Sequence, residues 1–199
     1  AVYSEKGGVV NIALEGILLS GAFAATTGTY YTGNVVFGIL CGVICGILVA
    51  LIHSFISITY KANQIVSGIA INILAFGVTK FFCKIIFNSS SNSARIPGLE
   101  TLNLPFNPFL VLCVLIVAVS YYIIYRTRFG LRLRAVGENP EAADSLGISV
   151  SKIRYAGVLI SGALAGLGGA WLALDQHSFT DGMSAGRGYI ALAAMMIGK

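Results

Sequence analysis

The sequence predicts an all-α, polytopic membrane protein, and its composition and its apolar runs are the observations that predict it. Of its 199 residues, 56% are hydrophobic and 11% are charged, and the mean hydropathy is +0.84. Soluble domains carry about 25% charged residues, so this chain has too few to cover a soluble globule. Apolar runs of about 18 residues or more are typical of membrane-spanning helices. We therefore expect a transmembrane helix bundle with a short cytoplasmic helix.

The expected helices follow the apolar runs in order. The first run, Ile12–Ala25, contains Glu15 and is short for a hydrocarbon core about 30 Å thick. A full span and a re-entrant helix are therefore both open for it, and the same holds for the last run, Tyr189–Gly198. The clear spans are Val35–His53, Ile65–Phe87, Pro108–Tyr125 and Tyr155–Leu174. The chain starts without Met and ends in an apolar run, so we expect residues 1–199 to be one transmembrane domain truncated at both ends.

The loop Arg126–Arg154 sets the expected orientation. Lys and Arg favour cytoplasmic loops, and this loop holds the largest basic group: Arg126, Arg128, Arg132, Arg134, Lys152 and Arg154. Counting spans from there also places Ser54–Gln64 and Lys6 inside. The loops expected outside are Thr26–Asn34, Asn88–Asn107 and Asp175–Arg187. The net charge of +5 belongs mainly to loops, so nucleic acid is not an expected partner.

Small residues recur at helical spacing in two of the spans. One ridge is formed by Gly38, Gly42, Gly46 and Ala50, and another by Gly157, Ser161, Ala165 and Gly169. Small residues at this spacing let helices approach closely in lipid, so we expect a tightly packed bundle. The cysteines lack metal-ligand spacing and are interpreted as small apolar residues: Cys41, Cys45, Cys83 and Cys113.

The segment Asn139–Gly147 predicts a short, capped helix within the cytoplasmic loop. Asn139 is a good N-cap, Pro140 suits the first helical position, and Gly147 suits the left-handed end. We expect the helix to expose Ala142, Ala143 and Leu146, with Glu141 near its positive end. From the residues alone, an ordinary loop helix and a docking helix for another protein are both open.

This segment resembles the start of the EAA loop of ABC-type importer permeases, through Glu141-Ala142-Ala143 and then Gly147. The chain resembles in particular the branched-chain amino acid, simple-sugar and nucleoside permeases, and most closely the last two groups. The isoleucine and Leu-Pro of the longer EAA consensus are absent at the expected spacing, which places the chain in a divergent group. Passages that carry the resemblance are Gly7–Ala25 (GGVVNIALEGILLSGAFAA), Asn63–Gly77, Arg126–Ile148 and Ser161–Trp171.

The resemblance implies a transport subunit of the bacterial cytoplasmic membrane. Its coupling helix would consist of Asn139, Pro140, Glu141, Ala142, Ala143, Leu146 and Gly147. That helix would dock on a separate ATP-binding cassette ATPase, which holds ATP and Mg, while this chain binds no cofactor. A second permease subunit, identical or different, and an extracytoplasmic substrate-binding lipoprotein are the other implied partners. The flanking basic residues would meet lipid phosphates of the bilayer or the ATPase.

Polar residues within the apolar runs are the candidates for a substrate pathway: Asn11, Glu15, Gln64 and Asn72. Asn11 and Glu15 are four residues apart, and Gln64, Gly68 and Asn72 are also spaced to share one helical face. Polar residues in spans are costly and often functional, but interhelical hydrogen bonds that fix packing are an equally open interpretation. A lining role suits a hydroxyl-rich or amide-bearing substrate, with a nucleoside ahead of a sugar and an amino acid.

The sequence also favours a transport subunit over an enzyme. It contains no Gly-x-x-x-x-Gly-Lys-Ser/Thr phosphate loop, no Gly-x-Ser-x-Gly and no His-Glu-x-x-His. ATP hydrolysis is therefore expected on another chain. Asp175, His177 and Asp181 are too few for a convincing metal site. An ion- or proton-driven carrier that titrates Glu15 stays open as the alternative.

Overall fold

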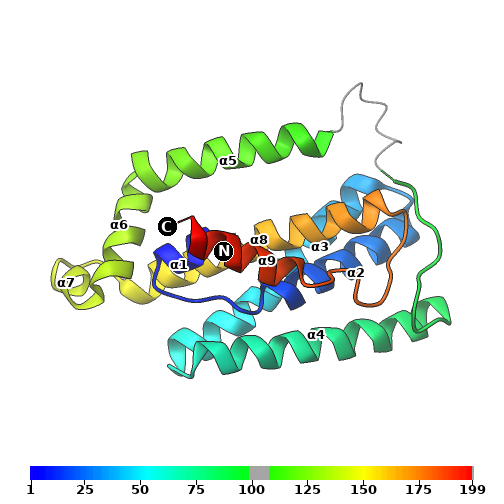
Figure 1. The fold of residues 1–199 in the computed structure, drawn as a ribbon, viewed down its shortest axis with the longest axis horizontal. Helices are drawn as coiled ribbons and strands as arrows, with labels where there is room; N and C mark the ends of the chain where they lie inside the picture. The colour runs from blue at the N-terminus through cyan, green and yellow to red at the C-terminus, as the bar shows by residue number, and fades with distance from the viewer. Residues whose placement is uncertain (99–107, 199) are drawn as a thin grey trace.

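The computed structural model describes residues 1–98 and 108–198, and these residues are mainly helical (Figure 1). The all-α prediction is confirmed. The helices are α1 (Val2–Lys6), α2 (Leu14–Thr32), α3 (Val35–Ser54), the π-helix η1 (Phe55–Thr59), α4 (Gln64–Phe87), α5 (Pro108–Arg126), α6 (Arg128–Glu138), α7 (Pro140–Ser145), α8 (Val150–Asp175) and α9 (Arg187–Ile197). Residues 99–107, which form the second part of the predicted loop Asn88–Asn107, lie outside the described residues.

The described residues contain four helices that are long and apolar enough to cross a membrane. They are Val35–Thr59, Gln64–Phe87, Phe109–Arg126 and Val150–Asp175, and they correspond to the four clear spans expected from the sequence. The apolar helix α9 is shorter.

The prediction for the first apolar run was wrong at both of its ends. Helix α2 begins only at Leu14, and it continues through most of the predicted outer loop to Thr32. Threonines are accommodated in this part of α2 because their hydroxyls donate to carbonyl oxygens four residues earlier, at 2.9 Å for both Thr26 and Thr27. Satisfying the hydroxyl within its own helix lets a polar residue lie in an apolar helix. Gly33 then ends α2 in the left-handed conformation, with φ 67°.

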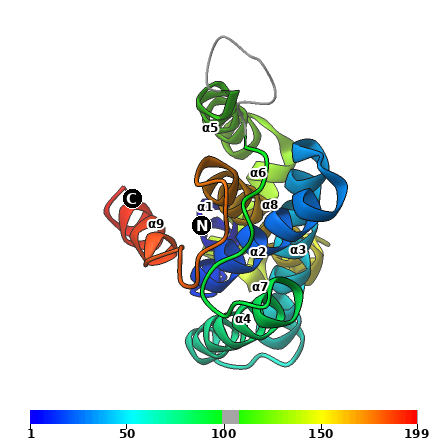
Figure 2. The same ribbon diagram turned by 90° about the vertical axis from the view of Figure 1, so that its right-hand side faces the viewer.

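The centre of the bundle is the packing of α2, α3 and α8, which Figure 2 shows gathered together. All four small residues of the first ridge are buried on α3. A Cβ added at Gly46 would lie 2.5 Å from the carbonyl oxygen of Gly162, and one added at Gly21 would lie 2.7 Å from Cα of Gly166. The helices therefore touch backbone to backbone, and the predicted close packing through small residues is confirmed.

The loops separate to the two ends of the bundle as the alternating topology predicts. At one end, the Arg154 Nε donates to the carbonyl oxygen of Gly7 at 3.2 Å, and α6 and α7 lie nearby (Figure 1). At the other end, backbone N–H groups of Ser93 and Ile96 donate to carbonyl oxygens of Phe179 and His177, both at 2.8 Å. The segments on each side were expected to lie together. Which end faces the cytoplasm stays a prediction.

Candidate functional site

Helix α7 has the local structure that its sequence predicts. The Asn139 side-chain oxygen accepts a hydrogen bond from the Ala142 N–H at 3.0 Å, and Pro140 is the first helical residue. Gly147 has φ +77°, and a Cβ added there would meet nothing within 4 Å. The helix lies at the extreme end of the bundle, beyond the ends of the long helices (Figure 1). Such a position leaves it accessible to another protein.

The exposed face of α7 differs from the prediction at one residue. Ala143 is buried at 2% exposure, whereas we expected it on the surface. It lies on the side of α7 that packs toward α6 and α8, and a helix this short has one side facing its own protein. The face open to a partner is instead formed by Glu141, Ala142 and Leu146, of which Leu146 is 80% exposed.

The basic residues around α7 are not equivalent. Arg126, Arg128 and Arg132 are exposed near the end of α5 and along α6. The Arg134 guanidinium instead lies 5.2 Å from the centre of the Tyr125 ring, a cation–π contact. Arg134 thus joins α6 to α5, while the exposed arginines are the ones available to lipid phosphates or to a partner.

Glu15 lies at the junction of α2 and α9 and is 2% exposed. One carboxylate oxygen accepts the Gly186 N–H at 2.8 Å, and the other accepts the Gly188 N–H at 2.7 Å. Gly186 is the N-cap position of α9. The Glu15 side chain therefore satisfies backbone donors at the start of a helix more than 170 residues away along the chain.

Gln64 and Asn72 share one face of α4, as predicted, and that face meets the chain leading into α2. Gln64 accepts the Val10 N–H at 2.7 Å. Asn72 accepts the Gly16 N–H at 2.8 Å and donates to the Ile12 carbonyl oxygen at 3.0 Å. These contacts are hydrogen bonds that fix packing, which is one of the two roles that the sequence left open for these residues.

Asn11 differs from the other polar candidates. It precedes α2 in a non-helical stretch, so the prediction that it shares a helical face with Glu15 was wrong. Gly7 and Gly8, the second with φ +77°, end helix α1 before this stretch. Asn11 is 1% exposed, and neither polar atom of its side chain has a hydrogen-bond partner among the described residues.

Two further residues of this polar junction were missed from the sequence. The Tyr189 hydroxyl accepts a hydrogen bond from the Asn72 amide at 2.9 Å. A Cβ added at Gly188 would lie 2.5 Å from the backbone nitrogen of Glu15, so this close approach requires glycine. The only available signal was the Gly-Arg-Gly-Tyr sequence at the start of an apolar run, which does not reveal its distant partner.

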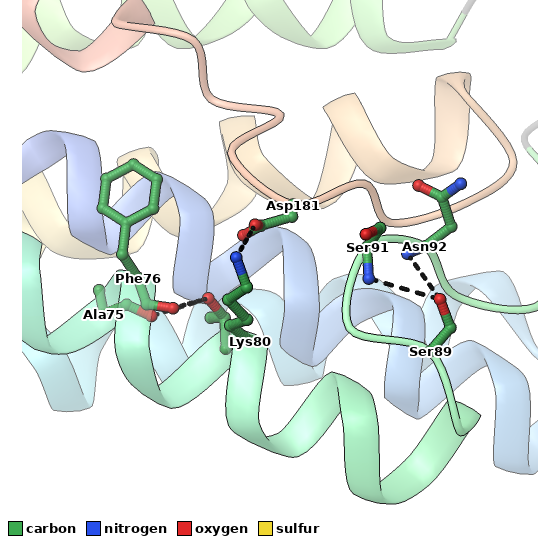
Figure 3. A network of polar contacts seen from close by, with 8 residues as sticks. Ala75, Phe76, Lys80, Ser89, Ser91, Asn92 and Asp181 are labelled. Atoms are coloured by element: carbon green, nitrogen blue, oxygen red, sulfur yellow. Dashed lines mark hydrogen bonds and ion pairs between the residues drawn. The ribbon is translucent and has the colours of Figure 1, made fainter.

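The end of the bundle opposite α7 carries an ion pair. The Nζ of Lys80 on α4 lies 3.0 Å from Oδ2 of Asp181 in the 175–187 loop (Figure 3). In the same region, the Ser89 hydroxyl oxygen accepts the N–H groups of Ser91 and Asn92. This pairing gives Lys80, a basic residue on the predicted outer side, a local partner. Residues 1–98 and 108–198 contain no group of three or more His, Cys, Asp or Glu side chains that could hold a metal ion.

Comparison with known proteins places the sequence of this chain in a family. The chain is 39% identical to a guanosine ABC transporter permease of Bacillus subtilis and 36% identical to a nucleoside ABC transporter permease of Lactococcus lactis, covering 100% of this chain and 69% of each relative. It is 35% identical to a putative glucose ABC transporter permease of Haloferax volcanii, over 98% of this chain and 64% of the relative.

The relatives are longer than this chain, which spans roughly two thirds of each (69%, 69% and 64%). No solved structure gave a significant match. The sequence profile described as the permease component of the branched-chain amino acid transport system matches residues 3–199. The protein is therefore an integral membrane transport subunit, and it belongs to the family of branched-chain amino acid transport system permease components.

Proposed function

We propose that this permease imports a nucleoside, with a simple sugar as the second candidate, using ATP hydrolysed by a separate subunit. The relatives named for guanosine and nucleoside transport, at 39% and 36% identity over the whole chain, support the nucleoside. The glucose permease at 35% identity supports the sugar. Asn11, buried just before α2 with both polar side-chain atoms unpaired, suits a substrate that carries hydroxyl and amide groups.

The coupling step is assigned to α7. The single observation that carries this assignment is Leu146, a large apolar side chain left 80% exposed at the extreme end of the bundle. An apolar residue on a projecting helix is a suitable anchor for a partner's pocket. Glu141 beside it adds a negative charge, and the rigid caps Asn139 and Gly147 keep the helix formed while it is pulled.

Because ATP hydrolysis is assigned to another chain, the proposal requires several partners. ATP and Mg are bound by an ATP-binding cassette ATPase, whose closure would move α7 and thereby rock the bundle. This chain is proposed to bind no cofactor itself. A second permease subunit and an external substrate-binding lipoprotein complete the proposed importer. The exposed loop pairing around Asp181 is on the side that the lipoprotein would meet.

The hydrogen bonds described above reduce the number of candidate residues for a direct substrate contact. Glu15, Gln64 and Asn72 already use their side chains on backbone groups. Asn11 keeps both amide atoms unpaired in a buried site, and an unpaired buried polar group is costly. Asn11 is therefore the strongest of the four candidates for a direct substrate contact.

Replacing Leu146 tests the coupling role. We expect Leu146→Asp, in the complete transporter in proteoliposomes, to insert normally but to lose at least about tenfold in ATP-driven uptake, because hot-spot contacts contribute about 2 kcal/mol or more. Uptake and ATP hydrolysis are both measured. Leu131→Asp, a comparable change at a residue 62% exposed on α6, is the matched control. Normal coupling in Leu146→Asp, or equal loss in both variants, would show that α7 does not dock the ATPase.

A further inference from the structure

Two helix N-termini meet at one buried carboxylate. Glu15 lies in the first turn of α2, and its two oxygens accept the N–H groups of Gly186 and Gly188 at the start of α9. Each helix N-terminus carries about half a positive charge, so the two together match the single negative charge of Glu15. Both oxygens of the Glu15 side chain therefore act as acceptors for backbone donors of α9.

The backbones at this point are too close for any side chain. A Cβ added at Gly188 would lie 2.5 Å from the backbone nitrogen of Glu15 and 2.6 Å from its Cα. A Cβ added at Gly16 would lie 2.9 Å from the Asn72 side-chain oxygen. The starts of α2 and α9 are therefore pressed together, with α4 against them.

Asn72 joins the three helices. Its oxygen accepts the Gly16 N–H at 2.8 Å, and its nitrogen donates to the Tyr189 hydroxyl at 2.9 Å. Asn72 is 3% exposed and Glu15 2% exposed. The bonds from the Gly16 N–H to Asn72 and from the Gly188 N–H to Glu15 are buried, whereas the bond to Tyr189 is partly buried. We name Glu15, Gly16, Asn72, Gly188 and Tyr189 the polar clamp.

Beyond its first turn, α9 has few contacts with the other described helices. Its main packing partner is α2, and Ile190 and Ile197 are 65% and 85% exposed. Figure 2 shows α9 standing apart from the other helices. The loop before it is tied to α4 by the ion pair of Lys80 and Asp181. The polar clamp holds the first turn of α9 through the bonds of Gly186, Gly188 and Tyr189.

We propose that Glu15 and Asn72 are positioning residues that hold α9 in the place that transport requires, with Glu15 as a fixed counter-charge for two helix ends. Glu15 then neither carries protons nor binds substrate. The inference rests on the proposed import only for its transport measurement, because the clamp itself is also visible as protection of the α9 backbone.

The test uses the complete transporter in proteoliposomes and two measurements. Hydrogen exchange reports the backbone of residues 186–190, and ATP-driven uptake of guanosine, with ribose as the sugar probe, is followed across external pH. In Glu15→Gln we expect faster exchange and about a tenfold fall in uptake with an unchanged pH profile, since charge-assisted bonds are lost. Tyr189→Phe removes only one hydroxyl and should shift both measurements less, in the same direction.

Asp175→Asn is the matched control, an acid-to-amide change at an exposed helix end, and should alter neither measurement. Should Glu15→Gln not assemble, Tyr189→Phe decides. Unchanged exchange at 186–190 in the variants overturns the clamp, as does faster exchange with full uptake. An altered pH profile in Glu15→Gln would assign proton transfer to Glu15 and equally overturn it. If wild-type protein imports neither probe, the nucleoside or sugar assignment fails, while the exchange data still decide the clamp.

Discussion

Single side chains control the ends of the short helices in this protein. Helix α7 has 6 residues, too few to be stable without external support, so its N-cap matters more than in a long helix. We predict that Asn139→Ala destabilises α7 locally by about 1 kcal/mol. Hydrogen exchange at residues 141–145 should then be roughly fivefold faster.

The same substitution at Asn63 is the comparison for this prediction. Asn63 caps α4 through the N–H groups of Ile65 and Val66, but α4 has 24 residues and packs along its length. Asn63→Ala should therefore change exchange in α4 much less. Equal effects in the two variants, or none in Asn139→Ala, would mean that α7 is held by packing instead of by its cap.

Features of the site that depend on nearby residues were predicted from the sequence, and those that depend on distant residues were not. Asn139 and Gly147 were predicted because capping depends on neighbours within a few positions. The burial of Ala143 was not, because it depends on how α6 and α8 approach. The partners of Glu15 were also missed, since its donors lie at Gly186 and Gly188, far along the chain.

At the scale of the helices, glycine spacing determines how closely the elements pack. A Cβ added at Gly162 would lie 2.7 Å from the Gly46 carbonyl oxygen, and one added at Gly168 would meet nothing within 4 Å. Both residues are on α8. We predict that Gly162→Leu costs at least about 1–3 kcal/mol through overpacking, whereas Gly168→Leu is tolerated.

Thermal unfolding of the two variants in detergent measures this difference. Gly162→Leu should unfold at lower temperature and give less monodisperse protein than Gly168→Leu. Indistinguishable stability would contradict the backbone-to-backbone packing of α3 and α8. Gly168→Leu is the matched control for Gly162→Leu, because both changes add the same side chain to α8.

The sequence predicted the helices that are continuously apolar, and it predicted less well the bounds of helices that contain polar residues. The four long spans stand out because each is continuously apolar. Helix α2 was cut short in the prediction because Thr26, Thr27 and Thr32 read as a polar loop, although each hydroxyl bonds within the helix. Its late start, after a non-helical stretch, depends on contacts with α4 that hydropathy does not encode.

At the level of the whole molecule, we propose that the two ends of the bundle contact different partners. One end presents α7 with its exposed Leu146, and the other closes with the loop pairing beside Asp181. Between them, the clamp on Glu15 links α2, α4 and α9. Movement of α7 would therefore reach the opposite end through helices that pack glycine to glycine.

We propose that this protein takes part in ATP-driven import and that α7 is its coupling helix. The most direct measurement is uptake of radiolabelled guanosine by proteoliposomes that hold the complete transporter, with ATP supplied or withheld on the ATPase side and with the proton gradient intact or collapsed. We predict uptake that requires ATP, survives loss of the gradient and is lost in Leu146→Asp. Uptake that persists without ATP but stops when the proton gradient collapses would contradict the account.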